Sequence, residues 1–194
     1  MTRLEAALLD LGAFLDEHHL PYMVIGGFAN LHWGSERFTR DVDLSVEVAD
    51  EALPDLLKHL ESRFSLAVAD PLEFVRRTHL VRLTTRTGVD ADLMIAVLPY
   101  EREAIRRAVA VDVAGRTVRL CTPEDLVIYK LASERPQDAV DVEGIVMRQG
   151  ARLDREYLWP RVRDLVAGLE RPEVETFFTK ALAKADAAGG DSDG

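Results

Sequence analysis

Two aspartates open a short alternating segment, and their spacing is the strongest chemical signal in the chain. In residues 42–48 apolar and polar side chains alternate, as in a strand with one buried face. Asp41 and Asp43 then lie on the polar face, where like charges repel unless something compensates them. Hard Mg²⁺ does so, because it takes carboxylate oxygens and keeps coordination sites open for phosphate. The pair indicates metal-assisted phosphate chemistry; the alternative is two solvated carboxylates on an exposed sheet face.

A third carboxylate comes from a second alternating segment, residues 89–97. Its apolar side chains share one face, and Asp90 and Asp92 share the other. If this strand neighbours the first, one of these two residues joins Asp41 and Asp43. Three carboxylates can hold two Mg²⁺ ions about 4 Å apart for in-line phosphoryl chemistry. We prefer Asp92 as the third carboxylate, because it lies deeper in the strand than Asp90, which sits beside a turn.

A glycine pair and several polar residues precede the aspartates. Gly26 and Gly27 follow a short apolar run, and Ser35, Arg37 and Arg40 occupy the stretch before Asp41. Glycines let backbone amides come close to a phosphate, helped by the N-terminus of a following helix. The arginines supply guanidinium forks that bind phosphate. A tight strand–helix turn with surface charge explains each residue alone, but the combination favours a phosphate-binding site.

Hydrophobic periodicity indicates the elements that must position these residues. We expect strands at residues 22–25, 42–48, 79–85, 89–97, 109–113 and 117–120. We expect helices at residues 2–19, 28–33, 50–62, 100–108, 123–134, 136–149, 154–168 and 172–187. The predicted fold class is α/β (α+β), with a short mixed sheet in an N-terminal lobe and a helical C-terminal lobe.

The expected strands end at residue 120 and only helices are expected after it, which predicts two lobes. The core lobe covers residues 1–120 and the helical lobe residues 121–188, and the small, polar, acidic residues 189–194 are expected to be disordered. A cleft between the lobes is the default place for a ligand.

Composition narrows the class of protein and its partners. The 194 residues are 47% hydrophobic and 30% charged, which excludes a disordered chain. No run approaches the roughly 18 apolar residues of a membrane span, and no signal peptide is recognisable. With a single cysteine, Cys121, these features predict a cytoplasmic protein. A net charge of −10 disfavours nonspecific binding to nucleic acid or anionic membrane, but allows one phosphate-rich ligand held by local arginines or metal ions.

The glycine turn, the string Thr39-Arg40-Asp41-Val42-Asp43 and the later strand carboxylate resemble the nucleotidyltransferase superfamily. The closest subset is the AbiEii-type toxins of toxin–antitoxin and abortive-infection systems. That subset is similar again over residues 122–132, where a helix carries Lys130, and in the following Arg135 and Asp138. The resemblance covers residues 20–150. The chain departs from it at Gly27, where many members have serine, and at Gln137, where lysine is common.

The resemblance implies transfer of an NMP from an NTP to an acceptor, with Mg²⁺ as cofactor and release of pyrophosphate. It implies the catalytic residues by position: Asp41 and Asp43 as metal ligands, and Asp92 as a third metal ligand or as the base that activates the acceptor. It also implies Gly26, Gly27, Ser35, Arg37, Arg40 and Lys130 for the nucleotide, with Arg135 and Asp138 in support. The implied partners are an NTP, an acceptor that is tRNA or a small molecule, and a cognate antitoxin protein. The alternatives are an antibiotic-type nucleotidyltransferase and a non-catalytic nucleotide-binding or antitoxin-like module.

Some of these residues also have simpler explanations. Lys130 lies in an otherwise apolar helical window, so it either extends along the helix to water or binds a triphosphate. Asp138 and Asp141 suit the first turn of a helix, where acids favour the helix dipole. Trp33 and Phe38 can stack on a nucleobase, but we expect them to pack in the core.

Overall fold

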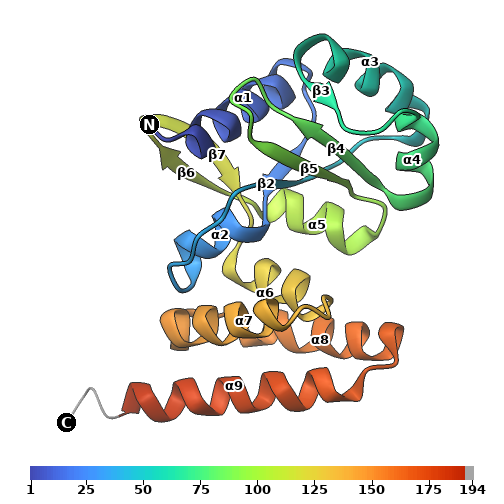
Figure 1. The fold of residues 1–194 in the computed structure, drawn as a ribbon. Helices are drawn as coiled ribbons and strands as arrows, with labels where there is room; N and C mark the ends of the chain where they lie inside the picture. The colour runs from blue at the N-terminus through green and yellow to red at the C-terminus, as the bar shows by residue number, and fades with distance from the viewer. Residues whose placement is uncertain (191–194) are drawn as a thin grey trace. The chain divides into compact units, whose positions relative to one another are not determined.

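A computed structural model describes residues 1–190 and divides the chain into two compact units (Figure 1). The sheet unit consists of Met1–Phe28 and Phe38–Thr122, and the helical unit of Ala29–Arg37 and the chain from Pro123 onward. The units are therefore discontinuous in sequence. Residues 29–37 group with the C-terminal helices, although the sequence pattern suggested one continuous lobe up to residue 120.

The sheet unit is built on a mixed sheet with the strand order β3-β4-β5-β2-β1-β7-β6. Its strands are β1 (Tyr22–Val24), β2 (Val42–Val46), β3 (Ser65–Leu66), β4 (Leu80–Thr84), β5 (Asp90–Ile95), β6 (Val109–Val113) and β7 (Arg116–Leu120). The pairs β2–β5 and β1–β7 are parallel, and the other pairs are antiparallel. The predicted mixed sheet and both predicted hairpins, β4–β5 and β6–β7, are confirmed.

The central strands β2 and β5 each bury the apolar side chains of one face. Val42, Leu44 and Val46 of β2 are fully buried, and Ala91, Leu93 and Ile95 of β5 are buried, so the predicted core faces of these strands are confirmed. The helices of this unit are α1 (Arg3–Glu17), the 3-10 turn η1 (Asp50–Ala52), α3 (Leu53–Arg63), α4 (Pro71–Thr78) and α5 (Pro99–Arg107). Helix α1 contacts β2 and β7, and α5 contacts β1 and β2.

Helix α2 (Gly26–Trp33) starts in the sheet unit and ends in the helical unit. The remaining elements are α6 (Pro123–Leu131), α7 (Pro136–Gln149), the 3-10 turn η2 (Gly150–Arg152), α8 (Arg155–Leu169) and α9 (Pro172–Gly190). Val142, Leu158 and Phe178 are completely buried among these helices. Helix α9 reaches Gly190, so Gly189 and Gly190 are helical, and the rest of the expected tail lies outside the described residues. No helix in residues 1–190 has the length and apolarity of a membrane span.

Candidate active site

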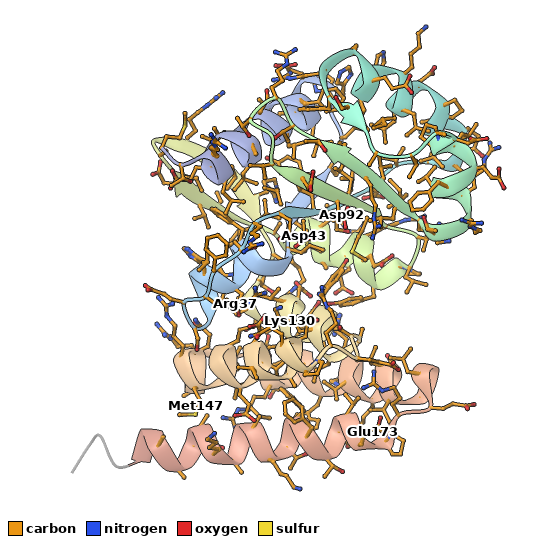
Figure 2. All side chains as sticks on the ribbon, viewed as in Figure 1. Arg37, Asp43, Asp92, Lys130, Met147 and Glu173 are labelled. Atoms are coloured by element: carbon orange, nitrogen blue, oxygen red, sulfur yellow. The ribbon has the colours of Figure 1, made fainter. Side chains whose placement is uncertain are left out.

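Two carboxylates meet on neighbouring strands of the sheet unit. In the parallel pair β2–β5, Asp43 lies directly opposite Asp92. Adjacent strands are about 4.8 Å apart, and side chains at paired positions face the same way. Figure 2 accordingly shows the two labelled aspartates next to each other. The sequence predicted that Asp92 joins the other aspartates only if the two strands are neighbours, and β2 and β5 are neighbours in the sheet.

Gly26 packs against the carboxylate of Asp43. The backbone N–H of Ile25 donates to the carbonyl oxygen of Asp43 at 2.9 Å, which brings the start of α2 beside β2. A Cβ atom built on Gly26 would lie 1.9 Å from Asp43 Oδ2, and Gly26 has a φ of +63°. Only glycine fits here. The glycine pair, predicted as a turn, forms the first two residues of α2.

Negative charge is concentrated around Asp92. Burial raises the pKa of Asp92; Arg82, whose Nε lies 3.6 Å from Asp92 Oδ1, opposes this rise, and the negative charges of Asp41 and Asp90 add to it. Asp41 accepts a hydrogen bond from Thr39 Oγ1 at 3.1 Å. Burial is therefore the main cause of the raised pKa of Asp92, and the neighbouring carboxylates make smaller contributions.

A cavity of about 300 Å³ opens beside these carboxylates, and Asp41, Arg82, Asp90 and Asp92 line it. Among residues 1–190, no three His, Cys, Asp or Glu side chains form a ready-made metal cluster. The paired carboxylates nevertheless fit hard divalent cations, because they supply the oxygen donors that Mg²⁺ prefers. The cavity leaves room for a reacting group beside Asp41 and Asp92.

In the helical unit, Lys130 is the centre of a buried ion cluster. Its Nζ donates to Asp138 Oδ1 at 2.8 Å and to Asp141 Oδ2 at 2.5 Å. Lys130 is only 5% exposed and both aspartates are 2% exposed. The lysine therefore does not extend to water, which excludes one of the two explanations drawn from the sequence.

Two arginines complete this cluster. Arg37 binds Asp141 through two nitrogens, with Nε at 2.9 Å from Oδ1 and Nη2 at 3.0 Å from Oδ2. Arg135 Nε donates to Asp138 Oδ2 at 2.7 Å. Three cations thus face two carboxylates. Figure 2 labels Arg37 and Lys130, which both belong to the helical unit.

Hydrogen bonding keeps both carboxylates of the cluster ionised. Burial alone would raise the pKa of Asp138, but hydrogen bonds from Lys130, Ser133 and Arg135 lower it below its usual value. Burial would likewise raise the pKa of Asp141, and hydrogen bonds from Arg37, Lys130 and Gln137 lower it. Asp138 and Asp141 are therefore both ionised at neutral pH.

Helix α7 holds the segment that carries Ser35 and Arg37. Arg148 Nη1 donates to the carbonyl oxygen of Gly34 at 2.7 Å, and Gln149 Nε2 donates to that of Trp33 at 2.7 Å. Asn30 Nδ2 donates to the carbonyl oxygen of Ser35 at 3.0 Å. Asp141, Arg148 and Gln149 were not among the predicted site residues. The sequence indicates Asp141 only as an acid that favours the helix dipole, and no local sequence pattern points to Arg148 or Gln149.

Phe38 and Arg40 lie in the sheet unit, on the surface before β2. Phe38 is 77% exposed, so the prediction that it packs in the core was wrong. The guanidinium carbon of Arg40 lies 5.3 Å from the centre of its ring. Of the site residues expected from the sequence, Gly26, Asp43 and Asp92 lie together in the sheet unit. Arg37, Lys130, Arg135 and Asp138 belong to the ion cluster in the helical unit.

Comparisons with known proteins identify the family and the fold of the chain. A family model described as "Nucleotidyltransferase of unknown function (DUF6036)" matches residues 3–170. The crystal structure of an antigenic nucleotidyltransferase-like protein from Paracoccidioides brasiliensis is 20% identical with a TM-score of 0.54, over 91% of this chain and 92% of that chain. The lincosamide antibiotic adenylyltransferase LnuA, solved with lincomycin bound, is 12% identical with a TM-score of 0.51, over 73% of this chain and 95% of its own.

No curated protein matches the chain. At these identities the two solved structures show a shared fold, and the family model extends over most of the sequence. The chain therefore belongs to the DUF6036 family of nucleotidyltransferases, and its sheet and following helices form a nucleotidyltransferase-like fold.

Proposed function

We propose that the protein transfers an NMP from an NTP to a hydroxyl-bearing acceptor in a Mg²⁺-dependent reaction. The observation that carries the proposal is the pairing of Asp43 and Asp92 on adjacent parallel strands, with Asp41 on the same cavity as Asp92. These three carboxylates would hold the metal ions. Bound Mg²⁺ would supply Lewis-acid stabilisation of the charge that develops on the phosphate oxygens.

Asp92 is our candidate for the base. The acceptor oxygen would bond to the α-phosphorus as the bond between that phosphorus and the α–β bridging oxygen breaks, and pyrophosphate would leave. Asp92 would take the proton of the acceptor hydroxyl, a role favoured by the raised pKa of its carboxyl group.

The remaining expected residues would bind the nucleotide. Gly26 and Gly27 offer backbone close to Asp43, and the Lys130 cluster has three cations for two carboxylates. We assign Lys130 and Arg37 to the triphosphate, with Asp138 and Arg135 supporting the lysine. Ser35 and Arg40 complete the assignment by family resemblance.

For the acceptor, we propose the end of a tRNA, as in AbiEii-type toxins that act with a cognate antitoxin. A small-molecule acceptor is the second candidate. It is favoured by the 300 Å³ cavity beside Asp41 and Asp92, which has the size of a small-molecule site. LnuA, which shares the fold, is an antibiotic adenylyltransferase.

Label transfer tests the proposed function directly. Pure protein with Mg²⁺ and each labelled NTP is incubated with total RNA or with a panel of hydroxyl-bearing antibiotics, and the label is followed into product. We expect one NTP to label one acceptor class and EDTA to abolish the transfer. Transfer that persists unchanged in EDTA would contradict the metal assignment. Failure of every NTP to release pyrophosphate would favour the non-catalytic module.

We expect Gly26→Ala to reduce transfer about 100-fold, the effect typical of displacing a catalytic group by roughly 1 Å. The reason is that the added Cβ cannot coexist with the Asp43 carboxylate 1.9 Å away. Gly88→Ala is the matched control, because Gly88 also has a positive φ, +74°, but nothing within 4 Å of the added atom. Initial rates and melting temperatures are measured for both. Equal loss of activity in the two variants would show that backbone strain alone is responsible.

A further inference from the structure

Gly144 of α7 lets the segment of residues 33–37 lie directly on this helix. A Cβ atom built on Gly144 would lie 2.5 Å from Ser35 Oγ, and 3.2 Å from both the Cβ atom and the backbone nitrogen of Ser35. The hydroxyl can rotate away, but the other two atoms move only with the chain, so Ser35 would shift by a few tenths of an ångström. Inside a helix glycine is less favourable than alanine. The close contact with Ser35 is what glycine provides at this position.

Asn30 of α2 holds the same residue through a hydrogen bond. Asn30 is completely buried, and its Nδ2 donates to the carbonyl oxygen of Ser35 at 3.0 Å. Its Oδ1 is also buried and has no hydrogen-bond partner within residues 1–190. Because a buried polar atom without a partner is unfavourable, packing alone does not favour asparagine here. The hydrogen bond to Ser35 accounts for the side-chain amide.

The backbone at Ser35 determines where Arg37, two residues further on, meets α7. The Arg37 guanidinium binds Asp141 of α7 through two nitrogens, at 2.9 Å and 3.0 Å. Such a bidentate pair requires the two planar groups to face each other in one orientation. Asp141 lies three residues before Gly144, so the two positions are neighbours on the surface of the helix. A shift of Ser35 relative to α7 therefore changes how Arg37 is held.

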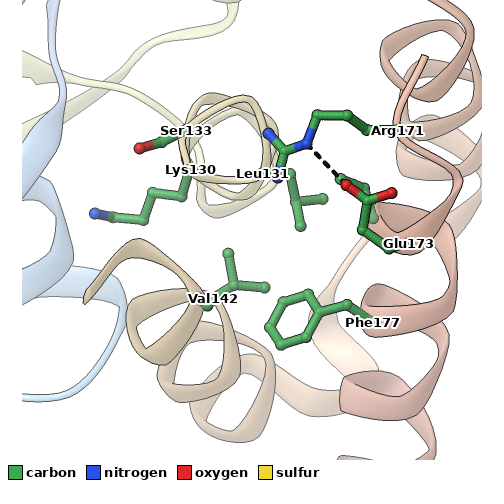
Figure 3. Close-up of a pocket in the computed structure, with 9 residues that line it drawn as sticks. Lys130, Leu131, Ser133, Val142, Arg171, Glu173 and Phe177 are labelled. Atoms are coloured by element: carbon green, nitrogen blue, oxygen red, sulfur yellow. Dashed lines mark hydrogen bonds and ion pairs between the residues drawn. The ribbon is translucent and has the colours of Figure 1, made fainter. Parts of the chain in front are cut away.

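Arg37 is more accessible to a ligand than Lys130. The Arg37 side chain is 29% exposed, against 4% for Lys130. Figure 3 shows the Lys130 ammonium pointing away from Leu131 and Val142, which line an apolar cavity, and this ammonium is bound to two carboxylates. A guanidinium has five N–H donors, so one that binds a carboxylate can also bind a phosphate. The position of the Arg37 guanidinium thus matters for a bound triphosphate.

We propose that Gly144 and Asn30 are positioning residues for triphosphate binding. Neither residue touches the ligand; both fix Ser35 against α7 and thereby direct the guanidinium of Arg37. The inference rests on the proposed function, because that function assigns Arg37 to the triphosphate. It concerns how the triphosphate is bound, and not the transfer that follows.

Inorganic tripolyphosphate with Mg²⁺ is the probe, because it represents the triphosphate of every NTP without its nucleoside. We expect Gly144→Ala to raise the Kd for tripolyphosphate about 10-fold, less than the effect of a displacement by roughly 1 Å. The KM for the NTP should rise with it while kcat stays nearly unchanged. Gly168→Ala is the matched control and should not change the Kd, because Gly168 is also inside a helix, α8, and a Cβ atom there meets nothing within 4 Å. Melting temperatures are measured for both variants, since a merely structural role would lower the melting temperature without changing the Kd.

A double-mutant cycle with Arg37→Gln tests whether Gly144 acts through Arg37. In that background Gly144→Ala should change the Kd by no more than about 2-fold, because the guanidinium that it displaces is absent. Asn30→Leu is the second variant. It keeps a similar volume, removes the donor to Ser35 together with the unpaired Oδ1, and should also raise the Kd about 10-fold.

Binding like the wild type by Gly144→Ala would overturn the role of Gly144, and the same result for Asn30→Leu would overturn that of Asn30. An effect of Gly144→Ala that is equally large without Arg37 would overturn the proposed route. A wild-type protein that does not bind tripolyphosphate would overturn the whole inference. If the variants weaken tripolyphosphate binding as expected but the wild type transfers no label, the positioning roles stand and the proposed transfer fails.

Discussion

Asp43→Asn is expected to lower nucleotidyl transfer by about 1,000-fold or more, because a neutral amide removes the charge of a metal ligand whose metal supplies several kcal/mol of transition-state stabilisation. The amide has the same shape as the carboxylate, and Asp43 is only half-buried, so the fold is retained. Initial rates with labelled NTP measure the activity, and the melting temperature reports the fold. Wild-type turnover by this variant would remove the metal site from the proposed function.

The third carboxylate is tested in the same assay. Asp92→Ala should be inactive, because Asp92 lies opposite Asp43 in the β2–β5 pair. Asp90→Ala is the matched control on the same strand. Asp90 is exposed and its Oδ1 accepts a hydrogen bond from Thr84 Oγ1 at 2.8 Å, so this variant should retain most of the activity. The opposite pattern would move the catalytic role to Asp90.

Lys130→Met is expected to lower the free energy of unfolding by about 3–5 kcal/mol, the usual cost of removing one partner from a buried ion pair. The substitution keeps an apolar stem but leaves Asp138 and Asp141 without the ammonium that both bind. Lys184→Met is the control, because Lys184 pairs with Glu143 at 3.1 Å with both side chains exposed, and such a pair is worth about 0–1 kcal/mol. Urea unfolding measures both variants. A loss below about 1 kcal/mol for Lys130→Met would contradict the cluster's role in stability.

The same cluster predicts how stability depends on pH. The pKa values of Asp138 and Asp141 are lowered in the folded protein, so the unfolded chain binds more protons on acidification. Their contribution is fully present well above the unfolded carboxyl pKa of about 3.9 and is lost as pH falls through the folded values. The stability difference between the wild type and Lys130→Met should therefore shrink below about pH 4. A difference that stays constant from pH 7 to 3 would contradict this linkage.

Local patterns predicted the elements that carry the carboxylates. The alternation over residues 42–48 and 89–95 correctly assigned the buried faces of β2 and β5, since the side-chain period of a strand is two. It failed at Val97, which lies beyond the end of β5 and is exposed. By contrast, β3 and α4 were not predicted. A strand of two residues is too short for a periodic signal, and α4 buries only Val75, so it has no apolar stripe to recognise.

The sequence predicted the ion cluster around Lys130 only in part, for a different reason. Asp141 fits the pattern of an acid near a helix start, but its partner Arg37 is 104 residues away in the sequence. The same holds for Arg148 and Gln149, which bind carbonyl groups 114 and 116 residues away. Periodicity reports which side of an element is apolar, but carries no information about such distant polar partners. The prediction for Phe38 was wrong because its residue type favours the core, while its position on a loop leaves it exposed.

The attachment of residues 29–37 to α7 has a consequence for how the protein is made. Ribosomes add about 5–20 residues per second, and a separation of 104 residues between Arg37 and Asp141 corresponds to about 5–20 s of synthesis. During that interval the carbonyl groups of Trp33 and Gly34 have not yet met their donors on α7 and stay hydrated. Strand β1 thus leaves the ribosome well before residues 29–37, which follow it, can bind to α7. A nascent chain that stalls or is cleaved before α7 leaves this segment unanchored and open to proteolysis.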